Sequence, residues 1–171
     1  MAERLERCGQ RPISALVDIS NYVLLELGRP THFFDLDKLS GTVTARWAKE
    51  GEKIELLNGK TVDLTPYYGV IADDNGSQAI AGIMGGSADS VSDDTVTLFI
   101  ETAIFRPAAI QGRARKLNFS SDSSFRFERG VDYGTTREHL EYITALVLSI
   151  CGTDATRVGP VSDIESDLPE R

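Results

Sequence analysis

The stretch "SALVDISNYVLLELGRPTHFFD", residues 14–35, contains the signals that organise the N-terminal part of the fold. Ser14 is of a type that caps helices, and apolar residues recur after it near helical spacing. Gly28 can end a helix in the left-handed region, and Pro30 forbids its continuation. The pattern therefore predicts a helix that begins after Ser14 and ends at Gly28, followed by a turn through "THFFDLDKLSG" at 31–41.

Short β-strands are predicted for the middle of the chain. Four β-like runs follow one another: "TVTARWA", "KIELL", "KTVDL" and "YGVIAD". The dipeptide Asn58–Gly59 separates two of them and is a strong hairpin signal. An apolar run over 79–86 and an alternating run over 95–101 then complete the predicted sheet.

Two more helices are expected after these strands. Pro107 suits the first turn of one helix in "FRPAAIQGRARKL". Thr135 and Glu138 have capping-box spacing at the start of another helix, which stops at Gly152. One side of that last helix carries apolar residues: Leu140, Ile143, Val147, Leu148 and Cys151. Because there is no regular βαβ alternation, we expect an α+β fold, a layered domain with a largely antiparallel, β-sandwich-like core flanked by helices.

The composition excludes several classes of protein. At 171 residues the chain is long enough for one well-buried core. No apolar run approaches the roughly 20 residues that span a bilayer, and the charged N-terminus does not resemble a secretory signal. Cys8 and Cys151 match no metal or redox spacing. We expect a cytoplasmic protein with no metal site.

The charge is unevenly distributed along the chain. A net charge of −8 argues against a uniformly basic nucleic-acid surface. Residues 106–130, however, hold six cations and two anions. This segment is either a local basic face that docks a phosphate backbone or a solvated helix face with internal ion pairs.

Two titratable residues are candidates for chemistry. His32 lies in the predicted turn beside phenylalanines, where it is either a packed structural residue or a base that orients water. Glu101 ends an apolar strand, so its carboxylate faces either solvent or a cavity. In a cavity it would accept a hydrogen bond from a ligand hydroxyl and disfavour an analogue without one. His139 is expected at the surface.

The glycine-rich and serine-rich segments exclude two familiar sites. The glycines of "AGIMGG" match neither GxGxxG nor a Walker loop, and they indicate either a tight turn or close approach of the backbone to a ligand. The "SSDSS" segment, 120–124, has no local base and no G-x-S-x-G elbow. A serine nucleophile is therefore not expected.

Four motifs in one order carry a family resemblance. They are "RPISALVDISNYVLLELGRPTHFFDLDKL", "IAGIMGG", "IETAIFRPAAI" and "SSDSSFRFERGVD". Together they resemble the B3/B4 region of the bacterial phenylalanyl-tRNA synthetase beta subunit, from about Arg11 to Gly152. The resemblance implies an editing domain over 1–155 and an acidic linker over 156–171 that leads to further domains.

In that family the B3/B4 region hydrolyses tyrosine that has been wrongly attached to the phenylalanine tRNA. The resemblance implies that Glu101 binds the para-hydroxyl of tyrosine, and that His32 and Asn21 lie near the ester and the attacking water. It assigns the pocket wall to Gly85, Ser121 and Ser123. Ser121 stands where the family usually has threonine, and Ser123 where it has alanine, which adds a hydroxyl to a normally apolar wall.

The resemblance also implies partners for the chain. These are the acceptor end of tRNA(Phe), with Arg11, Arg113 and Arg115 as contacts, and the synthetase alpha subunit in an (alpha-beta)2 heterotetramer. ATP and magnesium would serve the whole ligase in protein biosynthesis, with no cofactor in this domain. Two alternatives are open: a non-catalytic tRNA- or protein-binding module with a degenerate pocket, and a structural spacer, which predicts that His32 and Glu101 lie far apart.

Overall fold

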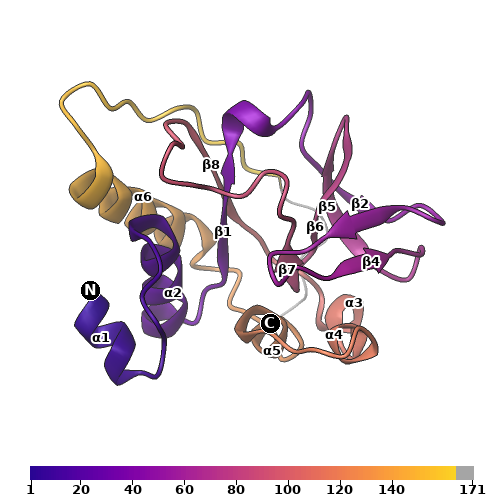
Figure 1. Cartoon of the computed structure of the whole chain (residues 1–171). Helices are drawn as coiled ribbons and strands as arrows, with labels where there is room; N and C mark the ends of the chain where they lie inside the picture. The colour runs from indigo at the N-terminus through magenta and orange to yellow at the C-terminus, as the bar shows by residue number, and fades with distance from the viewer. Residues whose placement is uncertain (165–171) are drawn as a thin grey trace.

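The computed structural model describes residues 1–164, which form helices and antiparallel strands in layers (Figure 1). The helices are α1 (Ala2–Arg7), α2 (Ala15–Leu27), η1 (Leu36–Lys38), α3 (Pro107–Ile110), α4 (Arg113–Lys116), α5 (Asp122–Phe127) and α6 (Thr136–Cys151). The strands are β1 (Thr31–Asp35), β2 (Thr44–Trp47), β3 (Lys53–Glu55), β4 (Thr61–Asp63), β5 (Gly69–Asp73), β6 (Gly76–Ile80), β7 (Met84–Gly85) and β8 (Leu98–Thr102).

Helix α2 confirms the prediction from the opening stretch. Its N-cap residue is Ser14, and Gly28 ends it in the left-handed region with φ of 67°. The Ser14 side chain makes no capping hydrogen bond. The Asp18 carboxylate instead accepts from the Ile13 amide at 2.8 Å, which places a negative charge at the positive end of the helix dipole.

The turn predicted at 31–41 is wrong over its first half. Residues Thr31–Asp35 form β1, which pairs in antiparallel fashion with β8. The residues after them form the short helix η1. The partner strand lies more than sixty residues further along the chain, so a local pattern cannot reveal the pairing. His32 consequently lies in a strand and not in a turn.

The β1–β8 ribbon lies between the helices and the main sheet. It can pack against both layers because successive side chains of a strand point to opposite faces. On one face, Phe33 packs with Ile19 and Val23 of α2 and with Ile143 of α6. On the other face, Phe34 packs against the sheet residue Ile71. Figure 1 shows α2 and α6 on one side of β1 and β8 and the sheet on the other.

The main sheet confirms the predicted α+β class. Its strands run in the order β2-β5-β6-β7, and each pair of neighbouring strands in it is antiparallel. The separate β3–β4 hairpin contains Asn58–Gly59 as predicted, and Gly59 has φ of 76°. A buried cluster that includes Leu56, Val70, Ile110 and Phe127 joins the hairpin, the sheet and the helices α3 and α5.

The C-terminal helices differ from the prediction in detail. The helix that begins at Pro107 is interrupted at Gly112, where φ is 76°, so it forms two short helices, α3 and α4. Thr135 is the N-cap of α6 but makes no side-chain capping bond. The capping box forms at α5 instead, between Ser121 and Ser124. On α6, Leu148 and Cys151 are exposed and do not join the buried side.

Arg29 connects three parts of the chain from a fully buried position. Its guanidinium donates to Nδ1 of His139 at 3.3 Å, to the Ala103 carbonyl at 3.4 Å and to the Asp132 carbonyl. His139 is therefore partly buried as an acceptor, and the prediction of a surface position for it is wrong. Helix α6 also packs against α2, which the sequence pattern of either helix alone does not show.

Residues 156–164 of the predicted linker contain no helix or strand. The remainder of that linker, 165–171, lies outside the described residues. None of the helices in the described part of the chain is both long and apolar enough to cross a membrane.

Gly82 should tolerate no side chain. Its φ is 66°, and a Cβ atom there would lie 2.8 Å from Phe105 and 3.0 Å from Ile110. Gly82→Ala should therefore lower the free energy of unfolding by about 2–4 kcal/mol through backbone strain and overpacking. Gly59→Ala is the control, because its φ is also positive but a Cβ would meet nothing within 4 Å. Urea unfolding should show a loss of only about 1 kcal/mol there, and equal losses at the two positions would contradict the packing.

Candidate functional site

A cavity of about 380 Å³ lies between the β1–β8 ribbon, the β6–β7 turn, helix α2 and the start of α5. The six residues predicted for the pocket all line it: Asn21, His32, Gly85, Glu101, Ser121 and Ser123. They come from α2, β1, β7, β8 and the N-terminus of α5. The fold therefore brings together residues that are up to about a hundred positions apart in the chain.

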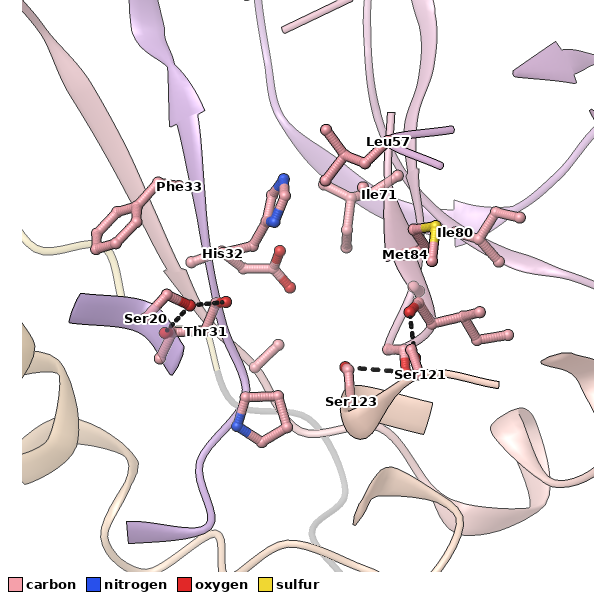
Figure 2. Close-up of a pocket in the computed structure, with 18 of the residues that line it drawn as sticks. Ser20, Thr31, His32, Phe33, Leu57, Ile71, Ile80, Met84, Ser121 and Ser123 are labelled. Carbon is pink, nitrogen blue, oxygen red and sulfur yellow. Dashed lines mark hydrogen bonds between the residues drawn. The ribbon is translucent and has the colours of Figure 1, made fainter. Parts of the chain in front are cut away.

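The walls of the cavity are largely apolar. Leu57, Ile71, Ile80 and Met84 line it from the sheet side. In Figure 2 the His32 side chain projects from β1 toward these residues, and Ser121 and Ser123 lie on the opposite side of the space from Thr31. Such a lining favours an apolar or aromatic group of a ligand, with a small number of polar side chains to orient it.

The register of the β1–β8 ladder places His32 directly opposite Glu101. Directly opposed residues of an antiparallel pair share a face and have Cβ atoms about 5 Å apart. Both side chains line the cavity, and an imidazole and a carboxylate are thereby held side by side in it. The spacer alternative predicted a large separation of these two residues, and that prediction is wrong.

Burial moves the pKa values of this pair toward the neutral forms of both groups. It raises the pKa of Glu101 to about 7 and lowers the pKa of His32 to about 4. At pH 7 His32 is neutral and Glu101 is close to half ionised. The pair can accept or donate hydrogen bonds without presenting two fixed charges to an apolar ligand.

Gly85 leaves room for the His32 ring because it has no side chain. A Cβ atom on Gly85 would lie 2.6 Å from Nε2 of His32 and closer still to Cε1. The imidazole also meets the Phe34 ring in a T-shaped arrangement, with ring centroids 4.4 Å apart. Nε2 is buried and has no hydrogen-bond partner among residues 1–164. His32 is thus oriented by packing and keeps unused hydrogen-bonding capacity.

The serines bind the backbone and leave little polar surface. The Ser121 hydroxyl donates to the Ile83 carbonyl at 2.6 Å, and the Ser123 hydroxyl donates to the Gly82 carbonyl at 3.1 Å. These bonds tie the start of α5 to the β6–β7 turn. The extra hydroxyl at Ser123 is therefore hydrogen-bonded to the backbone of the cavity wall.

Asn21 lies beside a polar contact that the sequence did not reveal. The Ser20 hydroxyl donates to the Thr31 carbonyl at 2.9 Å and lies 3.1 Å from the Thr31 hydroxyl, which joins α2 to β1 (Figure 2). The side-chain amide of Asn21 makes no hydrogen bond within the part of the chain that the structure describes, so it is available to a ligand or water. Nothing in the spacing of Ser20 and Thr31 signals their contact, because strand β1 was predicted as a turn.

The three arginines predicted to contact tRNA do not line the cavity. Arg11 and Arg115 are exposed. Arg113 donates to the Tyr67 carbonyl at 2.7 Å and to the Ala108 carbonyl at 2.6 Å, so part of its guanidinium is used within the chain. Among residues 1–164, no group of three or more metal-ligand side chains is placed to hold a metal ion.

The fold and cavity define an α+β domain with a pocket for a small, largely apolar group. A family model for the B3/4 domain matches residues 1–152, and the chain belongs to that family. It is 58% identical over all 171 residues to the phenylalanine–tRNA ligase beta subunit of Cupriavidus pinatubonensis. It is 56% identical over the same length to those of Burkholderia pseudomallei and Bordetella pertussis. The chain spans 21% of the length of each of these proteins.

One solved structure has a weaker likeness. It is an N-terminal fragment of the phenylalanyl-tRNA synthetase beta subunit from Pyrococcus horikoshii, at 15% identity and a TM-score of 0.46. The match covers 68% of this chain and 40% of that one. At this level the likeness adds nothing to what the chain's own fold shows.

The ionisation of Glu101 should make stability depend on pH. Its pKa is about 7 when folded against an ordinary value of 4.5, so the folded chain binds the proton more tightly. Stability from this group should fall as pH rises from about 4.5 to 7, by up to about 3 kcal/mol. Urea unfolding should be measured for the unaltered chain and for Glu101→Gln between pH 4 and 8. As pH rises through this window, the unaltered chain should lose unfolding free energy relative to Glu101→Gln. A constant difference would contradict burial of the acid.

His32 should act in the opposite direction, because its pKa falls from 6.5 to about 4 on folding. The contribution of neutral His32 to the free energy of unfolding is lost as pH falls from 6.5 toward 4. The comparison with Glu101→Gln removes this effect, since His32 is present in both proteins. Glu138→Gln, at an exposed position on α6 that does not line the cavity, is the control for the loss of one carboxylate.

A double-mutant cycle should reveal the contact between Gly85 and His32. Gly85→Ala should cost about 1–2 kcal/mol of unfolding free energy, because the added methyl displaces the imidazole. The same substitution in a His32→Ala background should cost less than about 0.5 kcal/mol. Additive effects would mean that the ring does not rest on Gly85.

Proposed function

We propose that this chain is the editing domain of a phenylalanine–tRNA ligase beta subunit and hydrolyses tyrosine that has been wrongly esterified to tRNA(Phe). The observation that carries the proposal is the convergence of Glu101, His32 and Asn21 on one apolar cavity. Membership of the B3/4 family and identity to ligase beta subunits supply its context.

Glu101 supplies the selectivity in this proposal. A phenol that enters the apolar cavity donates its hydroxyl hydrogen to the carboxylate, which is half-buried in the cavity and otherwise has no hydrogen-bond partner among the described residues. A phenylalanine side chain would leave that acceptor unsatisfied, and leaving a buried polar group unpaired is costly. The cavity thereby recognises the extra hydroxyl that a purely apolar synthetic pocket rejects poorly.

Water is the proposed nucleophile. The low pKa of His32 keeps the imidazole neutral at pH 7, so a ring nitrogen can accept a hydrogen bond from water or from the ester region. Asn21 offers an amide on the same wall. An aminoacyl ester is already activated, so orientation of the water by these two groups supplies much of the required assistance.

The serines take no covalent part in this mechanism. The hydroxyls of Ser121 and Ser123 donate to the carbonyls of Ile83 and Gly82, and neither has a base beside it. They shape the wall that faces the amino acid. This arrangement favours editing over the degenerate-pocket alternative, because the serine that departs most from the family pattern leaves the cavity open.

We place this domain in a cytoplasmic ligase with an alpha subunit, with ATP and magnesium serving aminoacylation elsewhere in the enzyme. The acceptor end of tRNA(Phe) would deliver the mischarged ester to the cavity. The match to about a fifth of each curated beta subunit supports a role as one domain among several.

Removal of the Glu101 carboxylate should abolish the preference for the phenol. Glu101→Ala, placed in the complete ligase that carries this chain, should lower the preference for tyrosyl- over phenylalanyl-tRNA(Phe) hydrolysis by about 100-fold or more. Release of labelled amino acid from each purified aminoacyl-tRNA measures this ratio. Glu138→Ala, an exposed acid on α6, is the matched control. Unchanged hydrolysis of tyrosyl-tRNA(Phe) by Glu101→Ala would remove the assignment.

A further inference from the structure

A row of cations and aromatic rings runs over the surface from the rim of the cavity. Leu57 lines the cavity yet is 52% exposed, so it lies where the cavity meets solvent. Lys60, three residues further along the β3–β4 hairpin, places its Nζ 5.5 Å from the centre of the Phe119 ring and donates to the Asn118 carbonyl at 3.3 Å. The hairpin is thereby joined to the segment that links α4 and α5.

The row continues over α4. Lys116 places its Nζ 4.0 Å from the centre of the Tyr67 ring. The Arg113 guanidinium lies 4.2 Å from the same ring centre and 5.8 Å from that of Trp47. Trp47 is at the end of β2 and is 54% exposed. We call the set Lys60, Tyr67, Arg113, Lys116 and Trp47 the cationic track.

The cations of the track differ from the other basic residues of the same segment. Arg126 pairs with Asp122 at 3.2 Å, and Arg129 lies 4.0 Å from Glu128. Lys60, Arg113 and Lys116 form no ion pair with any of the residues 1–164. Of the two interpretations of the basic segment, internal ion pairing therefore describes α5, whereas the track keeps its positive charge on a chain of net charge −8.

We propose that the cationic track binds the single-stranded RNA that adjoins the amino-acid-bearing end, with a base stacked on Trp47 and phosphates near Lys116 and Lys60. A positive path with exposed aromatic faces matches the two groups that single-stranded RNA presents, its phosphates and its bases. Tyr67 and the carbonyls that bind Arg113 hold the cations in place before RNA arrives, which reduces the side-chain entropy lost on binding. This inference rests on the proposed function, since the RNA would lead its esterified end past Leu57 into the cavity.

Trp47 is the single tryptophan of the chain and reports directly on the proposed stacking. A 3′-fluorescein-labelled 12-nucleotide single-stranded RNA, titrated at low salt, should bind and quench the indole emission. Trp47→Ala should weaken binding measured by fluorescence anisotropy by about 10-fold, and Trp47→Phe should restore most of it. The Phe variant separates stacking from a general loss of the fold.

Salt dependence tests the cations separately. Lys116→Gln and Lys60→Gln should each reduce the slope of log affinity against log salt by about 0.7. Arg137→Gln on α6, which removes the same charge from an exposed pair with Glu141, is the control and should bind like the unaltered chain. Binding unaffected by the substitutions at Trp47, Lys60 and Lys116 would overturn the track as the RNA-binding surface.

The RNA-binding role of the cationic track and the proposed editing activity can be tested independently. Track variants should raise the KM for tyrosyl-tRNA(Phe) and leave the hydrolysis of tyrosine ethyl ester, which carries no RNA, unchanged. Glu101→Ala should show the reverse pattern, with RNA affinity kept and tyrosyl hydrolysis lost. RNA binding that follows the track without any ester hydrolysis would refute the proposed function and leave the track in place.

Discussion

The antiparallel pairing of β1 with β8 positions both the helical layer and the residues of the cavity. It joins residues near position 32 to residues near position 101 in a fixed register. A shift of one residue would turn every side chain of the strand to the opposite face. In this register Phe33 and Ile100 face α2 and α6, and His32 and Glu101 face the sheet. The helical layer, the sheet layer and the chemistry of the cavity all follow from that single ladder.

The cavity combines two demands that oppose each other. Apolar walls favour an uncharged ligand, but they also penalise ionised groups, and the same burial raises the pKa of Glu101 and lowers that of His32. The chain tolerates this cost because β1, β7 and Phe34 hold the groups in place. Displaced pKa values in a cleft are typical of functional sites, where a ligand supplies the missing partner.

Local signals succeeded wherever their cause was local. The Asn58–Gly59 turn, the end of α2 at Gly28 and the start of α3 at Pro107 depend on the conformational limits of single residues. The prediction failed for β1, because its strand conformation is stabilised by β8 and by two packing faces. It also assigned the capping box to Thr135, whereas Ser121 forms one, because spacing permits a capping box but the path of the incoming chain decides whether the side chain can reach.

The α+β class, the hairpin and the main helices could be read from the amino-acid sequence, as could the set of cavity residues, through four motifs in one order. How those residues contact one another became visible only in the folded chain. It opposed His32 to Glu101, rested the imidazole on Gly85 and directed the hydroxyls of Ser121 and Ser123 to carbonyls. It also gathered Trp47, Tyr67 and α4 into one surface. Such contacts depend on register and layer packing between distant segments, which no local pattern of residue types contains.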